Sequence, residues 1–309
     1  MPLPEGYVAK PARREDAEAI TALFVEHELT FNQDPESTVE DLYDDWSAPE
    51  TDMEKDTFTV WDGDLLVAYT AVARVTPPDI YSAYGEVRPS HWGRRIGAFL
   101  VDVIEERVSE KAGGPALVRQ WVDASAAPAI ALLESRGYSF IRRFWRMSRS
   151  LEQDLESPRP VEGVTIRPFA KDEDDEAAHD ALEAAFQQLW GHTPRSYEET
   201  KESRWKAEWF RADLSLIAES DGAIVGVCIN GQRFGDGYVE DLGVIPEWRG
   251  RGIAEALLRT SLVLFTDLGM QKAGLNVDSD NTTGATRLYE RVGFANAYSY
   301  NAYEKRLGG

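Results

Sequence analysis

The sequence predicts two consecutive α/β domains, each built on a mixed (α+β) sheet. Three observations support this fold class. The chain has 309 residues, which is enough for two domains at ~150 residues each. Its two halves repeat each other in sequence. Within each half, short apolar strands alternate with helices that carry an apolar face, an order typical of sheets covered by helices.

The repeat is carried by short segments that follow one another in the same order in both halves. Residues 87–89 align with 244–246, and the glycine-containing turn at 93–97 aligns with the turn at 250–254. The offset is about 157 residues, a domain-sized period, so it indicates a duplicated domain rather than a solenoid.

Between the two copies the chain is polar and contains Pro158 and Pro160, a composition typical of a linker. We therefore expect a first domain over residues 1–150, a linker over 151–163 and a second domain over 164–309.

The second half opens with a predicted strand at 165–168, followed by an acidic helix over 177–189. Two apolar runs, 214–219 and 224–229, flank Asp221-Gly222. Apolar runs separated by this dipeptide predict a β-hairpin.

The rest of the second half alternates strands and helices. A strand is predicted over 237–244 and another over 273–277. Between them, apolar residues recur at helical spacing over 253–268, and Gly269 ends this helix. A last helix is predicted over 283–292.

The charge balance excludes some partners. The chain has 54 acidic residues against 33 lysines and arginines, a formal net charge of −21. Such a chain is a poor ligand for nucleic acid or for an anionic membrane surface. Its field attracts cations, including protonated amines, although acidic charge also serves solubility alone.

The chain contains few cysteines and histidines. Cys228 is the single cysteine, so we expect no disulfide within the chain and a reducing, cytoplasmic compartment. The four histidines lie far apart in the sequence, so we expect no metal site. The first residues lack a signal-peptide pattern, and no run reaches the ~18 apolar residues of a membrane helix.

The strongest local motif is the turn at 244–254. A predicted strand ends, Gly250 and Gly252 follow, and a helix begins. Free backbone N–H groups and a positive helix dipole at that point form a cradle for a pyrophosphate. Arg249 and Arg251 add positive charge. The alternative is an ordinary helix start with basic surface residues.

A second motif lies at 281–294, with Asn281, Tyr289 and Gly293. Together the two motifs resemble the acetyl-coenzyme A motifs of the GNAT N-acetyltransferase superfamily. The tandem layout and residues 276–281 resemble those of mycothiol synthase-like tandem members. The resemblance implies two tandem GNAT acyl-CoA N-acyltransferase domains, with acetyl-CoA as cosubstrate.

The resemblance also implies roles for individual residues. Strand residues Leu242 and Val244 would pair with the pantetheine arm, and an amide near Leu242 would stabilise the oxyanion. Asn281 would bind the pantetheine arm, and Tyr289 would protonate the departing thiolate. The pyrophosphate would lie on the backbone amides of Arg249, Gly250, Arg251, Gly252, Ile253 and Ala254.

The general base is expected on the preceding strand. Some family members carry an acid where this sequence has Tyr238, and others place the base at the position of Glu240. We favour Glu240, whose side chain should share a face with Tyr238 and Leu242 if side chains alternate along the strand. Asp241 should then face the other side and remains an alternative base, or a partner for an arginine.

The first half lacks most of these groups. Trp92 stands in place of Arg249, and Arg95 in place of Gly252. Leu133 replaces Tyr289, Ser125 stands opposite Asn281, and Ala83 falls at the position of Glu240. We therefore expect a degenerate first domain that supports the second or binds acyl-CoA weakly.

The segment 190–210 is rich in aromatic residues and should line the acceptor site of the second domain. Trp205 and Trp209, at helical spacing, are better explained by core packing. His192 is expected to be an ordinary polar loop residue. Cys228 lies in an apolar strand and should be buried and inert.

These observations favour acetyl-CoA-dependent N-acetylation of the primary amine of a small molecule, by direct attack on the thioester. One alternative is a non-catalytic acyl-CoA sensor or scaffold, and another is a protein N-acetyltransferase. The duplication is compatible with a monomer whose two domains form a pseudo-dimer.

Overall fold

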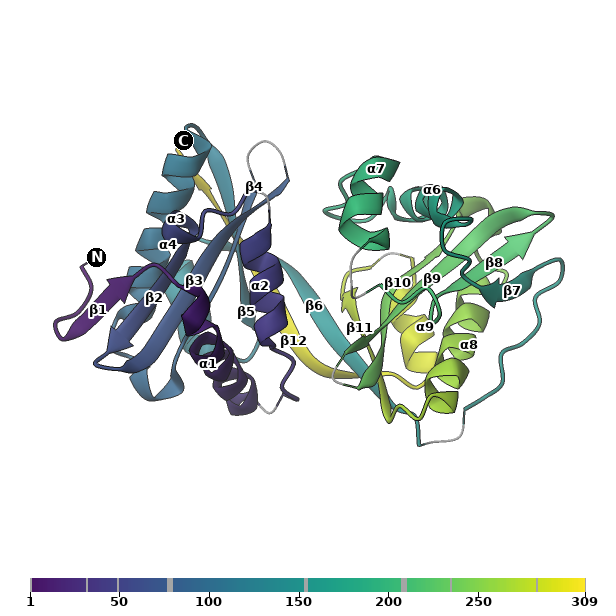
Figure 1. Cartoon of the computed structure of the whole chain (residues 1–309), viewed down its shortest axis with the longest axis horizontal. Helices are drawn as coiled ribbons and strands as arrows, with labels where there is room; N and C mark the ends of the chain where they lie inside the picture. The colour runs from purple at the N-terminus through teal and green to yellow at the C-terminus, as the bar shows by residue number, and fades with distance from the viewer. Residues whose placement is uncertain are drawn as a thin grey trace. The chain divides into compact units, whose positions relative to one another are not determined.

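The computed structural model divides the chain into two compact units (Figure 1). Unit 1 comprises Met1–Phe144 and Tyr298–Gly309, and unit 2 comprises Trp145–Ala297. The structure describes residues 2–31, 33–48, 50–76, 80–152, 155–206, 210–233, 235–281 and 283–308.

The sheet of unit 1 has the strand order β1-β2-β3-β4-β5-β12. β4 and β5 pair in parallel, and the other neighbours pair antiparallel. This mixed sheet confirms the predicted fold class. The strands are β1 (Tyr7–Lys10), β2 (Thr57–Asp62), β3 (Leu65–Thr76), β4 (Ile80–Val87), β5 (Ala116–Asp123) and β12 (Ala295–Leu307).

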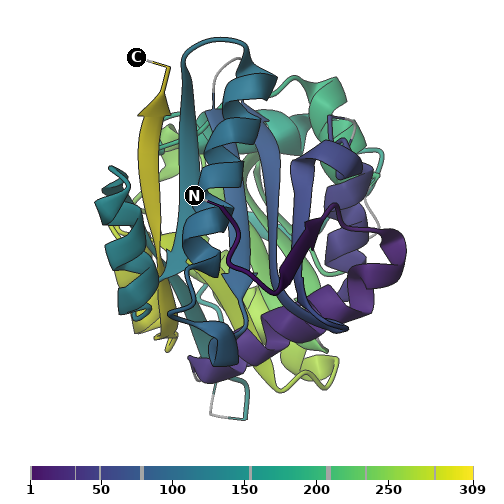
Figure 2. The ribbon, with the colours of Figure 1, turned by 90° about the vertical axis from the view of Figure 1, so that its left-hand side faces the viewer.

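Helices cover both faces of this sheet because alternate residues of its strands are apolar on each side. Tyr69 and Ala71 of β3 share one core with α1 and α2, and Val72 shares another core with α4 and α5. Figure 2 shows α4 lying over the strands. The helices are η1 (Arg14–Asp16), α1 (Ala17–Thr30), α2 (Val39–Ser47), α3 (Met53–Asp56), η2 (Pro89–His91), α4 (Ile96–Ala112) and α5 (Ala127–Ser135).

Unit 2 repeats this plan with the strand order β6-β11-β10-β9-β8-β7. β10 and β11 are parallel, as β4 and β5 are in unit 1. The strands are β6 (Ser139–Ser150), β7 (Thr165–Pro168), β8 (Leu216–Ser220), β9 (Ala223–Arg233), β10 (Asp236–Val244) and β11 (Lys272–Asp278). Residues 145–150 of β6 belong to this unit.

Helices also flank the sheet of unit 2. α6 packs on β9 and β10, and α8 packs on β8, β9 and β10. The helical elements are α6 (Asp175–Phe186), α7 (Tyr197–Thr200), η3 (Lys201–Trp205), η4 (Pro246–Trp248), α8 (Ile253–Asp267) and α9 (Ala285–Arg291).

The predicted hairpin at Asp221-Gly222 is confirmed. Ser220 of β8 pairs with Ala223 of β9, so the loop contains two residues. Asp221 has a φ of 50° and Gly222 a φ of 79°. Two successive positive φ angles define the type I′ turn, whose twist matches that of the flanking strands.

The C-terminal strand belongs to the sheet of unit 1, although the repeat assigns it to the second half of the sequence. Tyr300 pairs with Asp123, and the antiparallel ladder continues to Leu307 opposite Ala116. β12 therefore covers the edge of β5 that would otherwise carry unpaired backbone groups. In Figure 2 it is the yellow strand beside β5.

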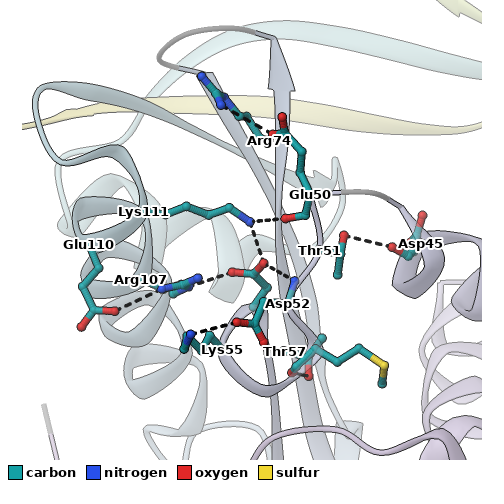
Figure 3. Close-up of polar contacts among 12 residues, drawn as sticks. Asp45, Glu50, Thr51, Asp52, Lys55, Thr57, Arg74, Arg107, Glu110 and Lys111 are labelled. Carbon is teal, nitrogen blue, oxygen red and sulfur yellow. Dashed lines mark hydrogen bonds and ion pairs between the residues drawn. The ribbon is translucent and has the colours of Figure 1, made fainter.

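A buried carboxylate joins α3 and α4 in unit 1. Asp56 is fully buried and accepts hydrogen bonds from Arg107 Nε at 2.7 Å and Lys111 Nζ at 2.6 Å. Figure 3 shows these two basic side chains reaching from α4 toward the segment before β2. Burial alone would raise the pKa of Asp56, but the hydrogen bonds from Lys111, Asp52 and Arg107 lower it overall.

Replacing this carboxylate should destabilise unit 1. Asp56→Asn keeps the shape of the side chain but leaves Arg107 and Lys111 without their common anion. Removing one partner of a buried ion pair costs about 3–5 kcal/mol, so we expect a lower urea midpoint at neutral pH. Because folding lowers the pKa of Asp56 below the ordinary range of an aspartate, its contribution is lost only as the pH falls through that lowered pKa, and the two proteins should converge there.

A matched control for this experiment is Asp64→Asn, in the exposed turn between β2 and β3. It makes the same change of charge without breaking a buried pair, so the urea midpoint should not move. Equal midpoints for Asp56→Asn and Asp64→Asn would contradict the role given to the buried carboxylate.

Candidate active site

Strand β10 contains one extra residue, and that residue is Glu240. Val239 pairs with Asn230 of β9, whereas the next paired residue of β10 is Asp241, opposite Ile229. Glu240 therefore forms a β-bulge, a feature that bends a strand and re-aims its side chains.

The bulge corrects the expected alternation of side chains. Strict alternation places Tyr238, Glu240 and Leu242 on one face. In the structure, Val239 and Leu242, three residues apart, pack in the same core with α8. Leu242 therefore lies on the face of Val239, and the grouping of Glu240 with Leu242 was wrong. The bulge is invisible in the hydrophobic pattern because Glu240 and Asp241 are both polar.

Both acids of β10 are held by arginines. Glu240 accepts from Arg233 Nε at 3.1 Å and from its terminal nitrogen at 3.2 Å. Asp241 forms an ion pair with Arg204 of η3. Arg204 and Asp241 also act electrostatically on Glu240, so the four groups form one charged cluster. The expected arginine partner of Asp241 is thus present, and Glu240 has one as well.

The balance of these effects makes Glu240 a better base than an ordinary glutamate. Burial raises the pKa of Glu240, and this effect outweighs the opposing effect of Arg233. Its side chain is 17% exposed. A carboxylate with a raised pKa takes up a proton more readily in general base catalysis.

Beside the bulge, the sheet of unit 2 opens. β10 pairs with β11 from Gly237 opposite Ala273 to Val239 opposite Leu275, and among the described residues no further pair joins these strands. Yet β10 continues to Val244 and β11 to Asp278. The facing edges beyond Val239 can therefore accept an extended ligand as an added strand.

The turn after β10 exposes backbone amides. Gly250 and Gly252 have φ angles of 76° and 86°, in the left-handed region that favours glycine. A Cβ at either position would meet no atom within 4 Å, so conformation rather than packing requires glycine there. Gly252 precedes the first turn of α8, where amides lack helical partners. This open turn fits a pyrophosphate at a helix N-terminus.

The side chain of Arg249 fixes this turn to the rest of unit 2. Its Nε donates to the Val244 carbonyl at 3.1 Å, and a terminal nitrogen donates to the Ala185 carbonyl of α6 at 2.8 Å. Arg251 instead lies over the Trp248 ring at 4.3 Å and is exposed. Arg251 is thus the better placed of the two to add charge at the turn.

Tyr289 lies on α9 and is 8% exposed. Its ring packs edge-on against Phe294 at 6.2 Å, in the core that contains Val239. Burial raises the pKa of Tyr289, so the hydroxyl stays protonated at neutral pH. It can therefore act as a proton donor.

Asn281 lies in the loop between β11 and α9. Its side-chain oxygen accepts a hydrogen bond from the Thr283 amide at 2.8 Å and a second one from the Thr283 hydroxyl. In unit 1, Asp123 makes the same turn with Ser125. Asp278, the last residue of β11, accepts from the Asp280 amide at 2.9 Å in the same way. The turn of Asp123, the last residue of β5, therefore matches that of Asp278, and the alignment of Ser125 with Asn281 stays a prediction.

Cys228 takes no part in this arrangement. It is buried, as predicted, and burial raises the pKa of its thiol to about 12. Its sulfur lies 3.4 Å from both Asn230 Oδ1 and Ser261 Oγ. A thiol with so high a pKa stays protonated at neutral pH and is a poor nucleophile.

The aromatic segment of unit 2 is largely core. Trp205 is 1% exposed and packs with Phe169 and Phe210, as predicted. Trp209 lies outside the described residues. His192 Nε2 lies 3.0 Å from a carboxylate oxygen of Glu183 of α6, at hydrogen-bond distance.

Unit 1 preserves the turn but not the bulge. Gly93 and Arg95 have φ angles of 74° and 66°, so Arg95 adopts the backbone conformation of Gly252. Trp92 Nε1 donates to the Val87 carbonyl at 2.7 Å, the counterpart of the bond from Arg249 to Val244. The sequence comparison could not show that Trp92 replaces Arg249 in this contact.

The chemical groups of unit 2 are missing from unit 1. β3 and β4 stay in register from Ala68 opposite Val87 to Arg74 opposite Tyr81, without a bulge. The Tyr138 amide donates to the Leu133 carbonyl as the Phe294 amide donates to Tyr289, both at 3.0 Å. Leu133 therefore occupies the position of Tyr289, as the sequence predicted.

Two segments of the chain match the model of the acetyltransferase (GNAT) family, residues 19–138 and 176–294. Together they span most of the sequence, so the chain belongs to the GNAT family and is an N-acetyltransferase with tandem domains. Acetyltransferases of this fold use acetyl-CoA or another acyl-CoA as acyl donor.

Curated relatives agree with this assignment. A mycothiol acetyltransferase from Streptomyces avermitilis is 31% identical over 240 residues, covering 75% of this chain and 74% of the relative. One from Thermobispora bispora is 32% identical over 242 residues, covering 76% and 78%.

Solved structures show the same tandem architecture. A GCN5-related N-acetyltransferase from Sphaerobacter thermophilus aligns with a TM-score of 0.86 and 29% identity, over 100% of this chain and 98% of that one. A tandem GNAT protein from the clavulanic acid biosynthesis pathway aligns with a TM-score of 0.76 over 98% and 99%; at 16% identity it supports the fold alone.

The described part of the chain meets the requirements of neither a membrane-spanning helix nor a metal site. No helix there has both the length and the apolar character to cross a membrane. No group of three or more His, Cys, Asp or Glu side chains there could hold a metal ion.

The geometry of the turn predicts the behaviour of Gly252→Arg. Unit 1 shows that arginine can adopt this backbone conformation, so the variant should fold, at a cost of about 1–2 kcal/mol for the left-handed φ. The side chain should obstruct the approach of an anion to the amides. We expect the rise in melting temperature given by millimolar coenzyme A to be reduced or lost.

Arg95→Gly in unit 1 is the matched reverse change. It should leave the coenzyme A response of the melting temperature intact. If Gly252→Arg kept the full response while Arg95→Gly altered it, the coenzyme A site would lie in unit 1.

Proposed function

We propose that unit 2 transfers the acetyl group of acetyl-CoA to the primary amine of a small molecule. The observation that carries this proposal is the bulge at Glu240, which stands beside the opened edge of β10 and ahead of the glycine turn. The features proposed for donor binding and for proton transfer thus lie on one strand, β10, and on the turn that follows it.

Donor binding follows the exposed backbone. The pyrophosphate lies on the amides between Arg249 and Ala254, and the pantetheine arm pairs with the edge of β10 near Leu242 and Val244. Asn281 contacts the arm from the loop before α9. An amide near Leu242 polarises the thioester carbonyl and stabilises the oxyanion.

Proton transfer uses the two ionisable groups flanking this edge. The neutral amine attacks the thioester carbonyl directly, without an acyl-enzyme, and its proton passes to Glu240, directly or through water. Collapse of the tetrahedral intermediate expels the thiolate, which takes the proton of the Tyr289 hydroxyl. Asp241 is the alternative base, although its ion pair with Arg204 supports a role in positioning that arginine.

The names of the curated relatives support a small-molecule acceptor, since both are mycothiol acetyltransferases. Tyr238 departs from members that carry an acid at its position. Its ring is covered by Arg146 at 4.3 Å and Arg233 at 4.4 Å. The acceptor that this face selects is therefore expected to differ from one selected by a carboxylate.

A non-catalytic acyl-CoA sensor is the competing function, and turnover distinguishes the two. Thiol release from acetyl-CoA should depend on the addition of one or more amines from a panel of small primary amines. Binding of acetyl-CoA without thiol release across that panel would favour the sensor.

Tyr289→Phe removes the proton donor and keeps the ring that packs on Phe294. The melting temperature should change little, whereas kcat should fall by about 10²-fold or more if proton transfer to sulfur matters. Phe294→Leu, which perturbs the same packing but leaves the hydroxyl, serves as control. Unchanged turnover in Tyr289→Phe would remove this residue from the mechanism.

Glu240→Gln tests the base through the pH profile. Because burial raises the pKa of Glu240, the acid limb of kcat/KM should lie above the ordinary range of a glutamate, with activity falling as the pH drops. That limb should flatten in Glu240→Gln. The same flattening in Asp241→Asn, with Glu240→Gln unaffected, would assign the base to Asp241 instead.

A further inference from the structure

Unit 1 contains a cavity that the proposed reaction does not use. Its volume is about 320 Å³, and it is lined by residues of α1, the segment before α2, α2 itself and β4. Small-molecule sites have volumes of ~300–1,000 Å³. The cavity is thus large enough for a small organic ligand.

The lining is strongly acidic. It has no lysine or arginine, and its one histidine, His27, lies 2.6 Å from Glu86 of the same lining. The acidic residues come from α1, the segment before α2, α2 and β4: Glu28, Glu36, Asp41, Asp45 and Glu86. This concentration of one sign of charge favours a cationic ligand.

Neutral donors orient two of these carboxylates without cancelling their charge. Asp45 accepts a hydrogen bond from the Tyr84 hydroxyl at 2.7 Å. Glu28 accepts from Ser37 Oγ at 2.7 Å and from the Glu36 amide at 3.1 Å. Burial raises the pKa of both Glu28 and Asp45. A bound cation would offset this penalty on the ionised forms.

The same cavity has apolar and aromatic walls. Phe24 and Tyr84 line it with ring centroids 6.2 Å apart, and Leu42 adds an aliphatic surface. Aromatic faces attract ammonium groups, and apolar walls pack against methylene chains.

The spacing of the carboxylates argues against a metal ion. A cation such as Ca²⁺ needs oxygen ligands converging at ~2.3–2.6 Å. Among the described residues no three acidic or histidine side chains converge in this way. Separated carboxylates instead suit separated positive charges on one longer molecule.

We propose that this cavity of unit 1 binds a linear polyamine, an organic cation with two or more ammonium groups joined by methylene segments. The ammonium groups lie against carboxylates from different elements, such as Asp45 of α2 and Glu86 of β4. The methylene segments lie on Phe24, Leu42 and Tyr84. This site does not depend on acetyl transfer in unit 2.

Titration calorimetry with spermidine at low ionic strength tests the proposal. We expect saturable binding of one spermidine per chain at this site. The uncharged 1,8-octanediol, a rod of similar length, should not bind. Glu86→Gln and Asp45→Asn should each weaken spermidine binding by about tenfold or more. The amide oxygen introduced by Asp45→Asn can still accept from the Tyr84 hydroxyl, so this variant keeps the test valid if Glu86→Gln disturbs folding.

The matched control is Glu54→Gln, an exposed residue of α3 outside the cavity, which makes the same change of charge. It should bind spermidine like the unaltered protein. If Glu54→Gln weakened spermidine binding as much as the cavity variants do, general electrostatic attraction would explain the binding, and the proposal would be overturned. So would full binding in both cavity variants, or loss of binding only in Glu240→Gln, which would place the amine in unit 2.

Discussion

The extra residue at Glu240 in β10 sets the direction of the acidic side chains at the candidate active site of unit 2. The pairing with β11 ends at Val239, next to the bulge, just as the parallel pairing of β4 with β5 in unit 1 ends at Ala83 although β4 continues to Val87. The same insertion places Glu240 and Asp241 within one cluster with Arg233 and Arg204. The bulge therefore places these two acids beside the open edge, whereas the edge itself also opens in unit 1, without a bulge.

The two units show how one scaffold can keep the backbone of a turn while the side chains around it change. Trp92 and Arg249 make the same hydrogen bond to the end of the preceding strand. The turn then takes the same left-handed conformation in both units, even with Arg95 in place of glycine. What unit 1 lacks is the corresponding bulge and a tyrosine on the last helix. Where unit 2 has an acid–arginine cluster, unit 1 has an acidic cavity with aromatic walls.

Neither half of the sequence supplies a whole unit. Unit 1 takes its strand β12 from the end of the chain, and unit 2 takes residues 145–150 from the first half. The two units are therefore not two separate, consecutive stretches of the chain. Deleting either half would also remove a strand from the remaining sheet and expose an edge.

The sequence alone determined the duplication, the mixed sheets, the hairpin at Asp221-Gly222 and the glycine turn, because each depends on local periodicity or on residues with special φ angles. It also placed Leu133 opposite Tyr289. Tertiary structure decided the rest. The bulge at Glu240 leaves no mark in a polar pair of residues, since register is set by the neighbouring strand. The pairing of β12 with β5 could not be predicted, because the pattern of a strand does not specify which strand it pairs with. The acidic cavity could not be predicted either, because its lining comes from segments far apart in the chain.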